Sequence, residues 1–246
     1  MKILWSAHTS EGSRKFNEDA YYADSDKGLF MLLDGMGGPG FGDEAARRAS
    51  FYVAEFLESM IENEEATWPY ERLENLTLHE NILRVSFLLA NERLHKEAFQ
   101  EYQKEVMGTS LLVAHIKGRK LILGHAGNSS AYLLREGYLT ELTENQSYAA
   151  EKRIVPLTPE KNIPLAVLGL QEKLPTAQFK EKMLKKGDRI LLVSDGVTSV
   201  LKNQELQKIL DSNSKDLQAF CEEVTSLAES RGTSDNATAF ILEAGE

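Results

Sequence analysis

Three aspartates in this sequence each stand at the edge of an apolar, strand-like run. Asp34 ends the run 28–33, Asp195 follows a similar run, and Asp235 precedes another. Buried carboxylates that meet at one point of a sheet repel each other unless a cation holds them together. Because ligands that are all oxygen favour a hard divalent ion, the sequence predicts a metal site for Mg²⁺ or Mn²⁺.

Short apolar runs predict the strands that must carry these carboxylates. The run 29–33 is wholly apolar, so we expect its strand to be buried on both faces. Glycine-containing turns between the later runs predict three antiparallel hairpins. These hairpins are 110–116 with 120–124, 131–135 with 138–142, and 179–183 with 188–194. Further strands are expected at 3–10, 16–23 and 237–242.

Helical spacing of apolar residues predicts helices between these strands. The first begins near Asp43, which is a candidate N-cap, and others are expected at 78–105, 203–210 and 215–230. Residues 144–161 lack periodicity and are expected to form a loop or a short helix. Strands in runs and helices in pairs are typical of an α+β fold, with antiparallel sheets packed together and helices outside. No linker or repeat interrupts 1–246, which favours a single domain.

Composition excludes several classes of function. A formal net charge of −10 argues against a nucleic-acid backbone as partner. Cys221 is the single cysteine, so there is no disulfide framework, and a reducing compartment fits. No apolar run approaches the roughly 20 residues that cross a membrane. We therefore expect a soluble cytoplasmic protein.

The five histidines lack metal-ligand spacing and are interpreted as surface or core residues.

At this point six short stretches together resemble the metal-dependent protein serine/threonine phosphatases of type 2C, in their compact bacterial form. They occur in that family's order and cover nearly the whole chain. Any one of them alone is weak, since an isolated aspartate is compatible with a turn and an isolated arginine with a solvated surface. The stretches are Arg14-Lys15-Phe16-Asn17-Glu18-Asp19, Leu33-Asp34-Gly35-Met36-Gly37-Gly38, Met107-Gly108-Thr109-Ser110, Gly127-Asn128-Ser129, Leu192-Val193-Ser194-Asp195-Gly196 and Ser234-Asp235-Asn236-Ala237-Thr238.

The resemblance implies a four-layer α/β/β/α sandwich of two antiparallel sheets flanked by helix pairs, with two divalent cations, Mn²⁺ or Mg²⁺, at one edge. In this family pattern Asp34 bridges both ions. Glu18 and the backbone carbonyl of Gly35 serve one ion, partly through water. Asp195 and Asp235 serve the other ion.

The resemblance also implies roles for residues around the metal ligands. Arg14 would bind the substrate phosphate, because a guanidinium offers a bidentate fork to phosphate oxygens. Asp19 and Asn236 would fix the geometry of the ligands. If residues 16–23 and those before them are extended, Arg14 and Glu18 share a face, because their offset is even.

The chemistry that the resemblance implies is hydrolysis of phosphoserine or phosphothreonine in a protein. Two metal ions about 4 Å apart lower the pKa of a bridging water and clamp the attacking and leaving oxygens. That water would attack phosphorus directly, without a phosphoenzyme. The substrate would be a phosphorylated protein, either a target of a serine/threonine kinase or the kinase itself. No nucleic-acid or membrane partner is expected, and a monomer is the expected state.

Some positions depart from the family pattern. Asn128 stands where the family usually has an aspartate that helps to bind a third, weaker metal ion. A neutral amide is a poorer ligand for a hard cation, so Asn128 predicts a weak or absent third site. Met36 stands where many eukaryotic members have a histidine that can act as general acid. The stretch 144–147 differs from the family's usual Asp-His-Ser and precedes a variable flap that shapes substrate access.

Three hypotheses remain open at this stage. The first is an active protein phosphatase, favoured because every implied metal ligand and Arg14 are present. The second is a non-enzymatic relative that binds a phosphoprotein without turnover. Its only support is the change at Asn128 and at Ser130. The third is a metal phosphohydrolase that acts on a small phosphate ester, because the same groups would handle either substrate.

Overall fold

The computed structural model describes residues 1–37, 40–62, 67–100, 107–154, 162–212 and 216–245. Ten strands in this part of the chain form two five-stranded sheets in which every pair is antiparallel. One sheet has the order β1 (Ile3–Ser10), β10 (Ala237–Ala244), β9 (Arg189–Val193), β6 (Ser130–Arg135), β7 (Tyr138–Glu141). The other has the order β2 (Asp19–Asp24), β3 (Leu29–Gly37), β4 (Met107–Lys117), β5 (Lys120–Ala126), β8 (Gln178–Met183).

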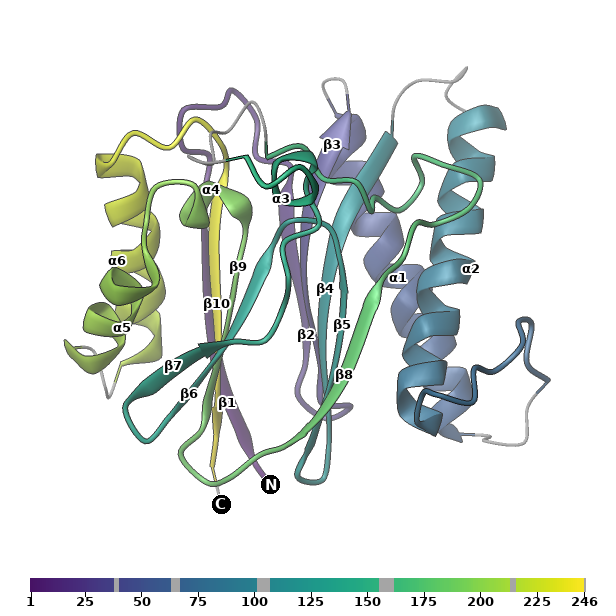
Figure 1. Ribbon diagram of the computed structural model, residues 1–246, viewed down its shortest axis with the longest axis horizontal. Helices are drawn as coiled ribbons and strands as arrows, with labels where there is room; N and C mark the ends of the chain where they lie inside the picture. The colour runs from purple at the N-terminus through teal and green to yellow at the C-terminus, as the bar shows by residue number, and fades with distance from the viewer. Residues whose placement is uncertain (38–39, 63–66, 101–106, 155–161, 213–215, 246) are drawn as a thin grey trace.

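Two helix pairs cover the outer faces of the sheets (Figure 1). Helices α1 (Phe41–Glu62) and α2 (Leu78–Gln100) pack on the sheet that contains β3. Helices α5 (Asn203–Ser212) and α6 (Leu217–Ser230) lie on the other side, where α6 packs against β1 and β10. The four-layer α+β sandwich is therefore confirmed. None of the helices in the described ranges is long and apolar enough to cross a bilayer.

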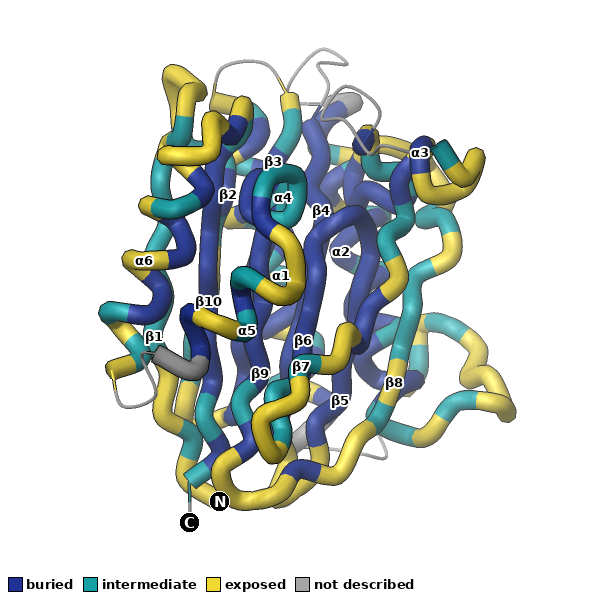
Figure 2. Tube along the Cα trace, turned by 60° about the vertical axis from the view of Figure 1, so that its left-hand side comes forward, coloured by how far each residue is buried: buried dark blue, intermediate teal, exposed yellow. Residues whose placement is uncertain are grey.

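The central strands are buried along most of their length (Figure 2). Successive side chains on a strand point to opposite faces, so each strand contributes to two apolar layers. Phe30 and Leu32 face the opposite sheet, where Phe30 makes an edge-on contact with Phe240. Met31 and Leu33, on the other face of β3, pack among residues of α1 and α2. The expectation that this strand is buried on both faces is confirmed.

The hairpin expected between 179–183 and 188–194 is wrong. Strand β8 pairs with β5, whereas β9 pairs with β10 and β6 in the other sheet, so the chain crosses between the sheets here. Leu184 is buried at the crossing, and its N–H donates to the carbonyl of Arg119. A turn glycine after β8 looks the same in sequence whether the next strand joins the same sheet or the opposite one.

Two element boundaries also differ from expectation, and a third is not covered by the described residues. The second strand begins at Asp19 instead of residue 16, because the residues before it form a turn-rich loop. Helix α1 begins at Phe41, so Asp43 lies in its first turn and is not the N-cap. Helix α2 is described to Gln100, and the expected continuation to residue 105 lies outside the described residues.

The architecture brings one end of several elements together (upper part of Figure 1). The end of β3 meets the start of α1 there. The short helices α3 (Tyr148–Glu151) and α4 (Asp195–Thr198) lie at the same end. The three aspartates at strand edges are thereby carried to one end of the sandwich.

His125 is a buried histidine that the fold keeps neutral. It lies on β5, on the same face as Leu121 and Leu123, and it is 1% exposed. Neither ring nitrogen of His125 makes a hydrogen bond of good geometry. Gln178 and the backbone of Ser129 lie nearby and favour a higher pKa, but burial outweighs them. Burial lowers the pKa of His125 to about 4. Because the unfolded chain takes up this proton near pH 6.5, His125 favours unfolding as the pH falls from there toward 4.

Replacing His125 by leucine should therefore flatten the acid side of the stability profile. We compare the free energy of unfolding of the His125→Leu variant with that of the parent. The difference, variant minus parent, should rise by about 1.4 kcal/mol for each pH unit as the pH falls from 6.5 to 4. Urea denaturation of both proteins across this range measures the difference. A difference that stays constant with pH would show that His125 is not the group responsible.

Candidate active site

A cleft of about 260 Å³ at this end of the sandwich gathers most of the residues singled out in the sequence. Asp19 and Asn236 lie beneath it and contact residues that line it. The lining residues are Arg14, Glu18, Asp34, Gly35, Met36, Gly37, Asn128, Asn162, Ile163, Pro164, Asp195 and Asp235.

Asp34 is placed by strand pairing. It lies opposite Asp19 on β2 and opposite Ser110 on β4, so two carboxylates face each other across adjacent strands. Thr109 Oγ1 donates to the backbone carbonyl of Asp34 at 3.1 Å. Beneath it, Asp19 is buried and accepts a 2.6 Å hydrogen bond from Thr238 Oγ1 on β10. The two sheets are thus joined directly under the cleft.

The pKa values of these carboxyl groups show that they act on one another. Burial and then repulsion by Asp235 and Asp19 raise the pKa of Asp195 to about 7. Burial is also the main cause that raises the pKa of Asp19 to about 6. The pKa of Asp34 lies well above its usual value because of burial and the charges of Asp195, Asp19 and Asp235. In the part of the cleft that the structure describes, ionisation of one aspartate therefore opposes ionisation of the next, and Arg14 offsets this only in part.

Glu18 reaches the cleft from the loop before β2. Its Oε1 accepts a 3.2 Å hydrogen bond from the backbone N–H of Gly42, in the first turn of α1. Its backbone carbonyl accepts from the N–H of Gly35 at 3.0 Å. Gly35 cannot carry a side chain here, because a Cβ would lie 2.1 Å from the carbonyl oxygen of Gly42. This close approach of loop, strand and helix brings the Gly35 backbone to the wall of the cleft.

The loop before β2 is held by Asn236, not by strand pairing. Its Nδ2 donates to the carbonyls of Glu11 and Phe16, both at 2.9 Å. Its Oδ1 accepts from the N–H of Glu18 at 3.0 Å. The argument that Arg14 and Glu18 share a strand face is therefore wrong, although both side chains line the same cleft.

Arg14 contacts one of the implied metal ligands. Its Nη2 donates to Asp235 Oδ2 at 2.7 Å, and its Nε donates to the carbonyl of Ser234 at 2.9 Å. The Arg14 side chain is 52% exposed, so one side of the guanidinium faces solvent at the mouth of the cleft. A phosphate that enters from solvent would meet this arginine first.

Asn162 is a site residue that sequence reasoning missed. Its Nδ2 donates to Asp195 Oδ2 at 2.9 Å, and Asn128 Nδ2 donates to the same oxygen at 2.7 Å. Asn162 lies directly after residues 155–161, which are outside the described residues, in a stretch without periodicity. No local pattern in the sequence identifies Asn162. Its role is visible only in the fold, where the segment that carries it returns to the cleft.

The donor groups fit a hard divalent cation in kind. They are carboxylate oxygens and a backbone carbonyl, and their repulsion is the condition that such an ion relieves. In the structure, the carboxylates of Asp235, Glu18 and Asp195 accept hydrogen bonds from Arg14, from the Gly42 N–H and from the two asparagine amides, respectively. Within the described residues, no three His, Cys, Asp or Glu side chains are gathered closely enough to hold an ion. Binding would therefore require Arg14 or the carboxylates to reorient.

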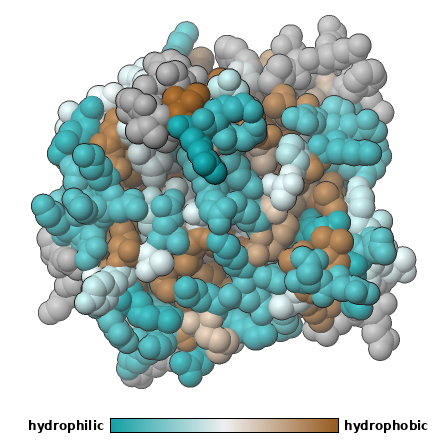
Figure 3. All heavy atoms as spheres, viewed as in Figure 1, coloured by the Kyte–Doolittle hydropathy of each residue, from teal (hydrophilic) through white to brown (hydrophobic). Residues whose placement is uncertain are grey.

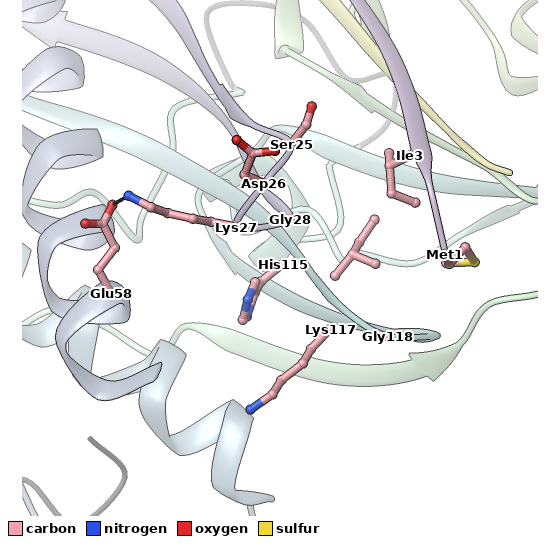
Figure 4. A pocket seen from close by; sticks show the side chains of 11 residues that line it. Met1, Ile3, Ser25, Asp26, Lys27, Gly28, Glu58, His115, Lys117 and Gly118 are labelled. Carbon is pink, nitrogen blue, oxygen red and sulfur yellow. Dashed lines mark hydrogen bonds and ion pairs between the residues drawn. The ribbon is translucent and has the colours of Figure 1, made fainter. Parts of the chain in front are cut away.

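A larger cavity of about 400 Å³ lies at the opposite end of the sandwich (Figure 4). It surrounds Gly28, at the start of β3, whereas Asp34 lies near the end of that strand. Its Lys27 Nζ pairs with Glu58 on α1 at 2.5 Å and with Asp24 at 3.6 Å. Because Lys27 and Lys117 in its lining offset Asp26 and Glu58, the smaller cleft, whose described lining has more carboxylates than cations, is the better candidate for catalysis.

Comparisons with known proteins show the family of this chain. The family model described as protein phosphatase 2C matches residues 6–240. The serine/threonine phosphatase stp of Listeria monocytogenes is 28% identical over 94% of this chain and 91% of its own length. Protein phosphatase PhpP of Streptococcus pneumoniae is 28% identical over 97% of this chain and 96% of its own length. The chain spans only 45% of Mycobacterium tuberculosis PstP.

Solved structures of bacterial phosphatases share the fold. Serine/threonine phosphatase Stp1 from Staphylococcus aureus is 27% identical, with a TM-score of 0.79 over 100% of this chain and 96% of its own. A catalytic domain of PstP in complex with two manganese ions is 25% identical, with a TM-score of 0.78 over 100% and 99% of the two chains. The chain belongs to the protein phosphatase 2C family, the metal-dependent serine/threonine protein phosphatases.

Proposed function

We propose that residues 1–246 act as one phosphatase domain whose metal ligands are five groups of the cleft. They are Glu18, Asp34, the carbonyl of Gly35, Asp195 and Asp235. The observation that carries this assignment is a cleft lined by oxygen donors, in which burial and then the charges of neighbouring aspartates raise the pKa of Asp34 and Asp195. Two divalent cations, Mn²⁺ or Mg²⁺, would relieve it, as expected from the PstP catalytic domain that contains two manganese ions.

Arg14 is the phosphate-binding residue in this proposal. It now donates to Asp235, and it stands at the solvent side of the cleft. When Asp235 is engaged by a cation, the guanidinium is available to donate to two oxygens of a phosphate. The same arginine thus restrains Asp235 before substrate binds and orients the phosphate afterwards.

Asp19 and Asn236 support the ligands from below. Asp19 is held by Thr238 and lies opposite Asp34, so it limits how far Asp34 can turn. Asn236 fastens the loop that carries Arg14 and Glu18 to the start of β10, beside Asp235. Bound divalent cations supply an activated water and offset the charge that develops on phosphate. The chain supplies the position of each ligand and of the phosphate.

The substrate class of the family is phosphorylated protein. In a bacterial cell that substrate would be a target of a serine/threonine kinase, or the kinase itself, and we place the reaction in the cytoplasm. A monomer suffices, because every proposed ligand comes from one chain. On the face seen in Figure 3, hydrophobic residues occur in separate patches among hydrophilic ones, which also favours a monomer.

Loss of the Asp34 carboxylate should abolish metal-dependent hydrolysis. We expect the Asp34→Asn variant to lose at least roughly 100-fold in kcat/KM, since about 3 kcal/mol of charge stabilisation depends on the bridging ligand. The measurement is turnover of a phosphothreonine peptide and of p-nitrophenyl phosphate with Mn²⁺, with Mg²⁺ and with chelator.

Asp26→Asn, in the cavity at the opposite end, is the matched control and should leave turnover unchanged. Preference for the peptide supports a protein phosphatase, whereas preference for p-nitrophenyl phosphate alone would favour a small-ester hydrolase. Metal binding without any turnover in the parent protein would instead indicate a phosphoprotein-binding relative. Undiminished turnover by Asp34→Asn would refute the ligand assignment.

Asn128 presents an N–H group, not an oxygen, to Asp195, which supports a weak or absent third metal site. Asn128→Asp would place two carboxylates against each other, and a further cation would then be needed between them. We expect calorimetric titration to show an additional Mn²⁺ ion bound by the variant and a higher Mn²⁺ concentration for half-maximal activity. Asn75→Asp, at an exposed position that does not line the cleft, is the control, and identical metal dependence of the Asn128 variant and the parent would contradict the assignment.

A further inference from the structure

Two asparagine amides converge on one oxygen of Asp195. Asn128 comes from the turn between β5 and β6, and Asn162 comes from the segment 162–168 that walls the cleft. Their Nδ2 atoms lie 2.7 and 2.9 Å from Asp195 Oδ2. Asn128 Nδ2 also donates to the backbone carbonyl of Asn162 at 2.8 Å, so the two asparagines are joined to each other as well.

The orientation of the Asn128 amide is dictated by its neighbours. Turning the amide over would place its oxygen against Asp195 Oδ2 and against the carbonyl of Asn162, where only a donor is tolerated. In the orientation adopted, Asn128 Oδ1 is buried and has no hydrogen-bond partner. A buried oxygen left unpaired opposes folding. The side chain is thus positioned for its contact with Asp195 at the expense of its own carbonyl group.

The segment that carries Asn162 is fastened to the rest of the cleft by backbone hydrogen bonds. The carbonyl of Ile163 accepts from Tyr148, and the N–H of Leu165 donates to Gln146. Leu168 exchanges two hydrogen bonds with Thr109, next to Ser110 on β4. Ile163 is 55% exposed and lines the cleft, so this segment forms a wall that an incoming peptide would touch.

We propose that Asn128 and Asn162 are positioning residues that clamp Asp195 Oδ2, leave Oδ1 as the cation donor, and couple the cleft wall to the metal site. This inference rests on the proposed function, because it takes Asp195 to be a metal ligand. Both donors are neutral, so they fix the carboxylate without cancelling its charge. A clamp made of cationic side chains would compete with the metal for that charge. A displacement of the 162–168 segment is transmitted through Asn162 to Asp195.

The test compares Asn162→Ala and Asn128→Ala with Asn75→Ala. The control Asn75 is exposed, lies in the loop before α2 and does not line the cleft. Calorimetric titration with Mn²⁺ measures affinity independently of activity. We expect one of the two ions to bind roughly 10–100-fold more weakly in the two clamp variants, as is typical when a group that orients a ligand is lost. Asn75→Ala should retain the parent affinity.

Kinetics provide the second measurement. The clamp variants should lose kcat at low Mn²⁺ and recover most of it at saturating Mn²⁺, with little change in KM for a phosphothreonine peptide. Parent-like Mn²⁺ affinity in folded clamp variants would overturn the proposal and reduce the asparagines to a structural role. If an alanine variant does not fold, Asn162→Ser, which retains a polar group, is compared in the same way. Absence of Mn²⁺ binding by the parent would refute the proposed function itself.

Discussion

The repulsion among buried carboxylates at one end of the sandwich is the constraint on which the rest of the structure depends. Asp19, Asp34 and Asp195 all have raised pKa values, and in each case burial is the first cause and neighbouring aspartates add to it. Such a cluster favours unfolding by itself. The apolar layers between the sheets and beneath the helices must hold the strands that carry it, and β3, buried on both faces, carries Asp34 within that frame.

The fold restrains these carboxylates mainly with neutral groups. A hydroxyl from Thr238 holds Asp19, and amides from Asn128 and Asn162 hold Asp195. Among the described residues that line the cleft, Arg14 is the cationic side chain, and it binds Asp235 at the solvent side. Neutral donors set direction while they preserve charge, whereas a lysine or arginine at each position would neutralise the site. The negative charge that attracts divalent ions is therefore retained.

The sequence predicts the layers and most of the ligands for identifiable reasons. Apolar runs and helical spacing report burial directly, so strands such as β3 and helices such as α1 are found at nearly their observed positions. The sequence does not report which strands are neighbours. It therefore predicts a hairpin where the chain in fact crosses from β8 in one sheet to β9 in the other. Asn162 was missed for the same reason, since its partner Asp195 is 33 residues away and no local pattern links them.

The pairing of β1 with β10 joins the first strand of the chain to the last. Asn236 connects these paired strands to the cleft, because its Oδ1 accepts a hydrogen bond from the N–H of Glu18, 218 residues earlier. During synthesis, therefore, Arg14 and Glu18 leave the ribosome early, but their partners Asp235 and Asn236 follow more than 200 residues later. Contacts of such long sequence separation form late, because closing the intervening chain is entropically costly. A nascent chain that has not reached β10 would thus lack the contacts that hold the loop with Arg14 and Glu18 at the cleft.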